Sequence, residues 1–424
     1  MNIIEFYSKV KLSLPVIREN DDFRKDLAAA LTHYVEVVKQ IDVESFSNQE
    51  EKDETLKKIS SLSDKIQEVV GLYYDGRRAN ALQSFREQME CPDGLFEHIG
   101  FYSIDITILR NYRNDKGELE SVKEPTIWFR ARVFEDKREH TFKEMFHIPL
   151  NKREKVSTQR YSAPGYPCLY LGNTVYSCWE EMHRKPHFDD LMFSGFRVRN
   201  SFTVYDLRIP KEDEFSGENL IKVLLRIPLI ISCMVRVKNT DDPFKPEYII
   251  PQLLIETIIC NNREKWQDQQ GPCDMPWGVI YTSTHISKDF PYGTDYLENI
   301  ALPVISCDGS DGSPDYCEVL ASLFDITDPL CYEYEALKEN DARVYWNEPL
   351  ETDEEKIEKQ YRESKMGYLE SCIKKEQFYT FPHLFFDIPK DGNIVIPQGG
   401  SSFFIKVRAE GAWECNVIPP DGQI

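Results

Sequence analysis

Apolar residues within the first 90 positions recur three and four residues apart, the spacing that gathers them on one face of an α-helix. Two such stripes stand on either side of a polar segment: Phe23, Leu27, Leu31, Tyr34, Val38 and Ile41, then Leu56, Ile59, Leu62, Ile66, Val69 and Tyr73. A third helix is expected to carry Ala81, Leu82, Phe85 and Met89 and to stop at Cys91-Pro92. Stripes of this kind are typical of helix-packing faces, so we expect a small N-terminal bundle.

Beyond residue 100 the pattern changes to the two-residue alternation of half-buried strands, most clearly in TIWFRARV at residues 126–133. Further strands are expected at residues 102–109, 168–171, 202–207 and 278–282, with a hairpin connection at 113–120 and a helix at 251–259. These strands and helices follow one another without regular alternation. The order favours an α+β fold.

The segment CDGSDGSPD at residues 307–315 is dense in Gly, Asp and Ser, which is typical of a linker. We therefore expect three parts: a helical N-terminal domain (1–95), an α+β domain (96–306) and a C-terminal extension (307–424). The extension is expected to contain a solvated acidic helix at 351–365 and strands near its end.

Composition limits the classes of partner. The formal net charge is −21, whereas binding of nucleic acid or anionic lipid needs clustered Lys and Arg, so we expect neither nucleic acid nor membrane as a partner. The most apolar segment, residues 223–235, is too short to span a bilayer and contains Arg226 and Pro228. No signal-peptide pattern opens the chain, and its 11 Cys include no CxxC pair, so reduced thiols and a cytoplasmic location are expected.

One stretch, RYSAPGYPCLYLGNTVYSCWEEMH at residues 160–183, brings a cation, an aromatic ring and carboxylates close together. Pro164-Gly165 predicts a turn, residues 168–171 predict a strand that displays Tyr170, and Asn173 or Thr174 is a suitable helix cap. We expect this helix to end near Arg184, ahead of Pro186.

The predicted helix presents one apolar face, made of Val175, Cys178, Trp179 and Met182. At about 100° per residue, Glu181 lies beside this face and Glu180 lies nearly opposite, toward water. Glu181 is therefore the better candidate for chemistry.

Five pieces of the chain, in order, resemble the RES domain family, which is named for its Arg, Glu and Ser. They are Arg130 in WFRARV, Arg160 in RYSAPGYPCLY with Tyr170, Glu181 eleven residues after that Tyr, the helix EYIIPQLLIETI, and Ser283 in GVIYTS. The resemblance covers residues 126–306. It implies an ADP-ribosyltransferase-like mixed sheet core and an enzyme that consumes NAD+.

The same resemblance implies that Arg160, Tyr170 and Glu181 are catalytic. Planar guanidinium groups bind phosphate oxygens in pairs, so Arg130 and Arg160 suit the pyrophosphate of NAD+. Tyr170 is expected to stack on the nicotinamide or ribose, and Glu181 to stabilise the oxocarbenium-like sugar of the transition state.

Two further side chains, Tyr161 and Ser283, complete the implied substrate-binding set. Ser283 is expected to form hydrogen bonds that position Glu181 or the ribose; no Ser/His/Asp arrangement surrounds it, so we do not expect a nucleophile. Neither a cofactor beyond NAD+ as substrate nor a metal is required.

The expected function is NAD+ degradation by a glycohydrolase or phosphorylase that acts as a growth-arresting toxin or a phage-defence effector. An inhibitory antitoxin-like protein and a second copy of the chain are possible partners. The helical N-terminal part is expected to act as a sensing, oligomerising or restraining unit of the enzyme. It has no Arg-x(4–6)-His motif, so we do not expect it to cut RNA. Two alternatives stay open: ADP-ribosyl transfer to a macromolecule, and a catalytically silent interaction protein on the same fold.

A rival interpretation of the same stretch is a metal site, because His183 and His187 stand four apart beside Glu180. Pro186 lies between the two His and should break the helical geometry that a shared ion needs. The sequence offers no third ligand, so we favour surface or capping roles.

Overall fold

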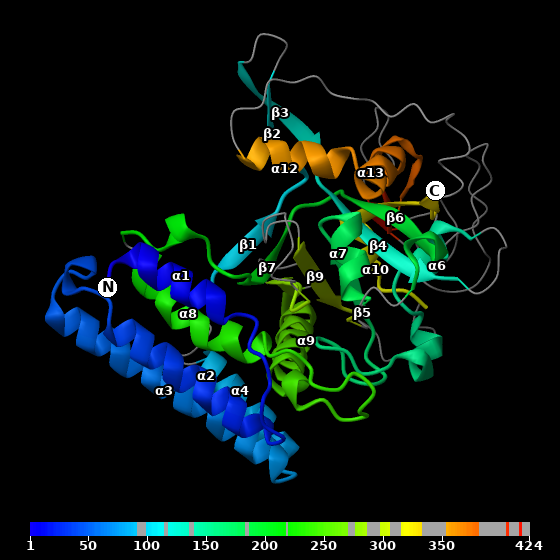
Figure 1. Cartoon of the computed structure of the whole chain (residues 1–424). Helices are drawn as coiled ribbons and strands as arrows, with labels where there is room; N and C mark the ends of the chain where they lie inside the picture. Colours follow the sequence, from blue (N-terminus) through cyan, green and yellow to red (C-terminus); the bar gives the residue numbers. More distant parts are fainter. Residues whose placement is uncertain are drawn as a thin grey trace.

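The structure is a computed structural model that describes residues 1–90, 99–113, 118–134, 140–182, 186–217, 219–269, 276–285, 297–305, 315–332, 353–380, 404–406 and 415–417. Figure 1 shows a layer of N-terminal helices beside a large sheet, with further helices near the C-terminal part of the described chain.

The chain opens with helices α1 (Ile3–Ser13), α2 (Phe23–Lys39), α3 (Gln49–Tyr74) and α4 (Arg78–Glu90). Side-chain caps explain where two of them begin: Asp22 accepts the N–H of Arg24 at the start of α2, and Asn48 accepts that of Glu51 at the start of α3. Every residue of the first predicted stripe is buried. The predicted N-terminal bundle is therefore confirmed.

Helices α8 (Asn219–Cys233) and α9 (Ile249–Gln269) pack against this bundle. Buried residues of α1–α4, α8, α9 and the strands beneath them form one continuous hydrophobic cluster, so the N-terminal helices have no separate core. The boundary predicted near residue 95 stays a prediction.

Pro228 lies inside α8 and cannot donate the backbone hydrogen bond that the carbonyl of Leu224 would normally accept. The hydroxyl of Tyr34 on α2 donates to this carbonyl instead, at 2.7 Å. The bond joins the N-terminal bundle to α8, the helix that contains most of the apolar segment 223–235. Among the described helices none is long and apolar enough to cross a bilayer.

A nine-stranded sheet has the order β1-β7-β8-β9-β5-β4-β6-β10-β11, in which only the β7–β8 pair is parallel. Its strands are β1 (Phe101–Ile104), β4 (Ile127–Val133), β5 (Cys168–Gly172), β6 (Leu191–Val198), β7 (Phe202–Leu207), β8 (Val279–Thr282), β9 (Glu298–Pro303), β10 (Phe324–Thr327) and β11 (Phe378–Tyr379). The predicted α+β class with a mixed sheet is confirmed.

Strands β2 (Thr107–Arg113) and β3 (Leu119–Pro125) form a separate hairpin, as the predicted connection at 113–120 requires. The single strand predicted at 102–109 is wrong, because the chain leaves the sheet after Ile104 and continues into β2. The helix predicted at 251–259 is longer at both ends, spanning Ile249–Gln269. Residues 307–314 of the predicted linker lie outside the described residues.

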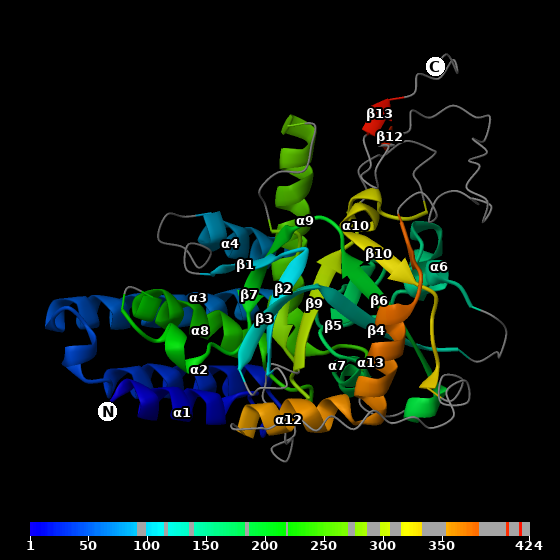
Figure 2. The same cartoon turned by 90° about the horizontal axis from the view of Figure 1, so that it is seen from above.

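Helices cover both faces of the sheet (Figure 2). One face carries α6 (Phe142–Met145) and α10 (Glu318–Leu323). The other is covered by α7 (Val175–Glu181), α9 and, from the C-terminal extension, α13 (Lys365–Lys375). The extension also contains α12 (Asp353–Arg362) and the short pair β12 (Phe404–Lys406) and β13 (Cys415–Val417), so its predicted strands are confirmed.

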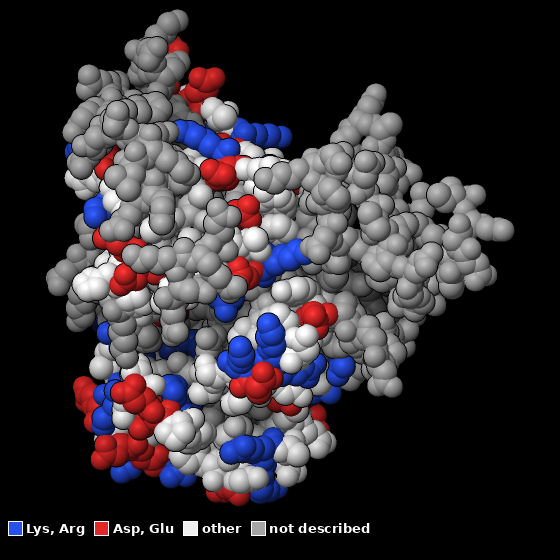
Figure 3. All heavy atoms as spheres, turned by 90° about the vertical axis from the view of Figure 1, so that its right-hand side faces the viewer, with Lys and Arg blue, Asp and Glu red and all other residues white. Residues whose placement is uncertain are grey.

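Charged side chains are mixed on the described part of the face drawn in Figure 3, where Lys and Arg lie among Asp and Glu.

Candidate active site

Helix α7 carries Glu181, and its start is held by the loop before it and by the C-terminal extension. Thr174 caps the helix by accepting the N–H of Ser177 at 2.9 Å, as one of the two predicted caps. The carboxylate of Glu370, on α13, accepts the N–H of Val175 at 2.8 Å and the hydroxyl of Tyr361 at 2.5 Å. An acid at a helix N-terminus satisfies N–H groups that have no partner within the helix.

Gly172, the last residue of β5, allows α7 to approach the sheet closely. A Cβ atom at this position would lie 2.1 Å from the Oγ of Ser177 and 2.9 Å from the Sγ of Cys178. Only glycine therefore fits here, because any larger residue would push α7 away from the sheet.

The Glu181 carboxylate lies at the C-terminal end of α7, against the interior strand β9. Its Oε1 accepts a hydrogen bond of 3.0 Å from the amide of Asn299, which is buried on β9. Burial raises the pKa of Glu181, and the hydrogen bond of Ser283 and the charge of Arg160 lower it in part. Glu181 is thus placed in one environment with two of its predicted partners.

The Arg160 guanidinium is held by backbone oxygens. Its Nη1 donates to the carbonyls of Cys233 and Val235 at 2.8 and 3.0 Å, and its Nη2 donates to the hydroxyl of Thr284 at 3.1 Å. The guanidinium carbon lies 5.2 Å from the centre of the Tyr248 ring. Three of five N–H donors have partners among the described residues, so two are available to an anion.

Tyrosine rings line the space between these charged groups. The hydroxyl of Tyr170 accepts the backbone N–H of Tyr161 at 3.1 Å, and the Tyr161 ring lies 4.7 Å from that of Tyr281. Burial raises the pKa of all three phenols, so they stay protonated at neutral pH. Tyr161 is only 1% exposed, and its predicted contact with substrate stays a prediction.

Strand register explains why these groups meet. Gly172 pairs with Asn299, and Asn299 pairs with Tyr281. Residues directly opposite in paired strands project from the same face, here the face that α7 covers. Ser283 follows β8 directly, and its hydroxyl accepts the N–H of His285 at 3.1 Å.

Arg130 lies on the other face of the sheet from this cluster, although Tyr170 and Cys178 are close enough to influence its pKa. The pairing of Phe129 with Gly172 places Phe129 on the face of α7, so Arg130, the next residue of β4, projects from the opposite face. Its Nη1 is buried and has no hydrogen-bond partner among the described residues. Burial, aided by the charge of Arg132, lowers the pKa of Arg130 to about 9, so it remains a cation at neutral pH.

Glu180 does not point to water, and that prediction is wrong. Glu180 is only 6% exposed, because neighbouring segments cover the side of α7 that a helical wheel assigns to water. Burial lowers the pKa of Arg236, and the charge of Glu180 offsets this only in part. The Nε of Arg236 donates to the carbonyl of Thr284 at 2.9 Å. Arg236 is thus a further cation close to the site.

The rival metal interpretation falls partly on His183, outside the described residues. Within the described ranges no group of three or more His, Cys, Asp and Glu side chains is arranged to hold a metal ion.

Sequence reasoning missed Asn299, Tyr248 and Arg236. The signal for Asn299 was present, since it is a polar residue inside the apolar run LENIALP. Tyr248 and Arg236 lie in connections around α8 and α9, and nothing in their local pattern distinguishes them from ordinary loop residues.

Comparison with known proteins gives one informative similarity. A Bacillus subtilis (strain 168) protein named "Putative toxin YopC" is 28% identical over 382 residues, which cover 86% of this chain and 78% of that protein. No family model matches the chain, and no solved structure matches it. The similarity to a protein named as a toxin thus spans most of the chain, whereas the resemblance to the RES family stays a prediction.

Proposed function

We propose that this protein is a toxin that degrades NAD+ at the cluster of Arg160, Tyr170, Glu181 and Ser283. The observation that carries the proposal is the convergence of these side chains from separate segments on one face of the sheet. A chain that needed only a core would gain nothing by burying a carboxylate beside a guanidinium there. The similarity to a protein named as a toxin supports the biological part of the proposal.

In the proposed reaction the bond between nicotinamide and ribose breaks, nicotinamide leaves with the electron pair, and the sugar gains cationic character. The ionised Glu181 stabilises this cation, and its surroundings of low dielectric strengthen the attraction. Water attacks the sugar carbon and loses a proton, giving ADP-ribose; attack by phosphate gives the phosphate ester.

Arg160 would bind the pyrophosphate through its two remaining N–H donors, while the carbonyls of Cys233 and Val235 hold it in place. Asn299 would fix the rotamer of Glu181 through Oε1, leaving Oε2 for the ribose. Arg130 is proposed only as a more distant phosphate contact, because it projects from the other face of the sheet.

Mass spectrometry of products after incubation with NAD+ tests the proposal. Free ADP-ribose or its phosphate ester, together with nicotinamide, is the expected result. A mass added to the protein or to another macromolecule would instead establish ADP-ribosyl transfer. Unchanged NAD+ with both the wild type and Glu181→Ala would overturn the enzymatic function.

A further inference from the structure

The N-terminal arm between α1 and α2 lies against the segment that holds Arg160. The N–H of Val16 donates to the carbonyl of Met234 at 3.1 Å, and the N–H of Arg236 donates to the carbonyl of Val16 at 2.8 Å. These bonds form a parallel bridge between Val16 and Val235.

Carbonyl groups alternate in direction along an extended chain. The carbonyl of Met234 accepts from Val16, whereas that of Val235, the next residue, accepts from Arg160. The carbonyl of Cys233, the last residue of α8, also accepts from Arg160. The short segment after α8 therefore has the N-terminal arm on one side and Arg160 on the other.

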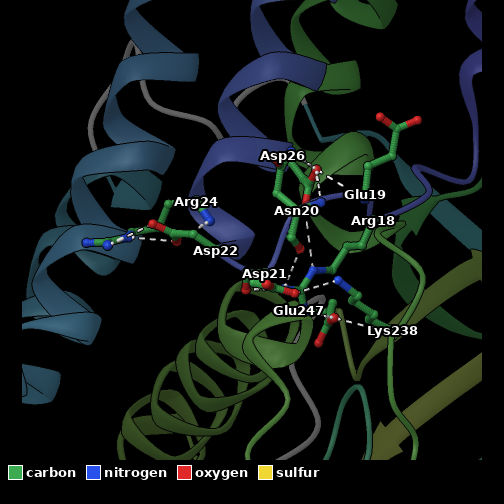
Figure 4. Close-up of polar contacts among 9 residues, drawn as sticks. All are labelled: Arg18, Glu19, Asn20, Asp21, Asp22, Arg24, Asp26, Lys238 and Glu247. Carbon is green, nitrogen blue, oxygen red and sulfur yellow. Dashed lines mark hydrogen bonds and ion pairs between the residues drawn. The ribbon is translucent and has the colours of Figure 1, made fainter.

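Arg18 fixes the arm by a buried ion-pair network (Figure 4). Its Nη1 lies 2.7 Å from Glu247, and its Nε lies 3.6 Å from Asp26. The three side chains are 7%, 1% and 5% exposed. The Nη2 donates to the carbonyls of Asn20 and Asp21, so the guanidinium also shapes the arm itself.

Glu247, the partner of Arg18, also links the N-terminal arm to the surroundings of Arg160. Its Oε1 also accepts the N–H of Lys238, two residues beyond Arg236. The residue that follows it, Tyr248, presents its ring to the Arg160 guanidinium. Arg18 thus holds both supports of Arg160, the carbonyl-bearing segment and the aromatic ring, without contacting Arg160.

We infer that Arg18 is a positioning residue for Arg160, so that the N-terminal arm forms part of the site rather than a separate appendage. The expected effect on NAD+ binding rests on the proposed function. The positioning of Arg160 by Arg18 does not depend on it. Substrate affinity should depend on Arg18 through Arg160 alone.

The chain offers a matched control. Arg24 also pairs with an Asp of the same connection, Asp22, at 2.9 Å, but these two side chains are 50% and 31% exposed and lie apart from Lys238 and Glu247 (Figure 4). Arg24→Gln removes a similar ion pair at the surface, where it contributes little.

The test measures NAD+ dissociation constants in a Glu181→Gln background, which prevents turnover. Arg18→Gln should weaken binding about tenfold, as expected when a hydrogen-bonded charge pair that orders the site is lost. Arg24→Gln should change it less than about twofold. In an Arg160→Ala background Arg18→Gln should add nothing, because its effect is transmitted through Arg160.

Equal effects of Arg18→Gln with and without Arg160 would overturn the inference, as would an effect no larger than that of Arg24→Gln. If Arg18→Gln does not fold, Arg18→Lys carries the same test. It keeps the charge but loses the fork, so binding should weaken about threefold, again only when Arg160 is present.

Hydrogen exchange at the amide of Arg236 separates this inference from the proposed function. The amide donates to Val16, so its exchange should accelerate about tenfold in Arg18→Gln and not in Arg24→Gln. Wild-type protein that neither binds nor consumes NAD+ would refute the proposed function. Unchanged exchange would refute the inference independently.

Discussion

The amide of Asn299 donates a 3.0 Å hydrogen bond to Oε1 of Glu181, joining the start of β9 to the end of α7. A hydrogen bond to a charged group contributes about 1.5–3 kcal/mol. This contact therefore gives the carboxylate a defined direction, and it provides a way to shift its ionisation without removing it.

Asn299→Asp should move the acid limb of the pH–rate profile for NAD+ consumption to higher pH. A second carboxylate at hydrogen-bond distance disfavours ionisation of Glu181, whose pKa burial already raises. Initial rates across a pH series provide the measurement. Asn200→Asp, at an exposed position, should leave the profile in place; an unmoved limb in Asn299→Asp would show that ionisation of Glu181 does not control the rate.

Glu181→Gln should stabilise the protein at pH 7 and abolish NAD+ consumption. Because the folded-state pKa of Glu181 is raised, the folded protein binds its proton more tightly than the unfolded chain. Stability from this group is then lost as pH rises from the unfolded pKa, about 4.3, through the folded value. Melting temperatures should show a gain over wild type at pH 7 that disappears near pH 4. A gain of equal size at both pH values would contradict this origin.

His147 should make the protein sensitive to mild acid. Its Nδ1 donates to the carbonyl of Ile148 at 2.8 Å and its Nε2 accepts the N–H of Cys317 at 2.8 Å, so both ring nitrogens are used in the neutral form. Burial lowers the pKa of His147 to about 4. Its contribution to stability is therefore lost as pH falls from the unfolded pKa of about 6.5 to about 4, on the order of 3 kcal/mol in total.

Urea unfolding of wild type and His147→Gln at pH 7 and pH 5 measures this contribution. Gln keeps a donor and an acceptor but does not titrate, so the variant should lose less stability between the two pH values. The same loss in both proteins would assign the acid sensitivity to other groups.

Tyr34→Phe should destabilise the protein by about 1–3 kcal/mol, because the carbonyl of Leu224 is then buried without a donor. Pro228→Ala restores the N–H that α8 lacks at this point. In that background Tyr34→Phe should therefore cost less than half as much, as denaturant unfolding of the four proteins can show. A cost that is independent of residue 228 would mean that the hydroxyl does not replace the missing donor.

Local patterns predicted the elements well and their assembly less well. The stripe from Phe23 to Ile41 and the alternation of TIWFRARV arise directly from which side chains are buried. Both patterns therefore predict their elements, α2 and β4. The bundle's packing against α8 depends on contacts far apart in sequence, such as Tyr34 with Leu224, and no local pattern contains these.

The candidate site divides in the same way. Glu181 and Arg160 belong to one short stretch and were predicted from it, whereas Asn299 joins them only through the pairing of β9 with β5. Glu180 was misplaced because a helical wheel assumes that one side faces water, and here both sides of the helix end are covered. The side of the sheet on which Arg130 projects depends on the register of β4 against β5.

The NAD+ concentration in cells that produce this chain tests the central claim most directly, with Glu181→Ala produced at the same level as the control. The account predicts that NAD+ collapses with the wild type and stays at the level of non-producing cells with Glu181→Ala. Equal NAD+ concentrations in both cultures, with both proteins folded, would contradict it.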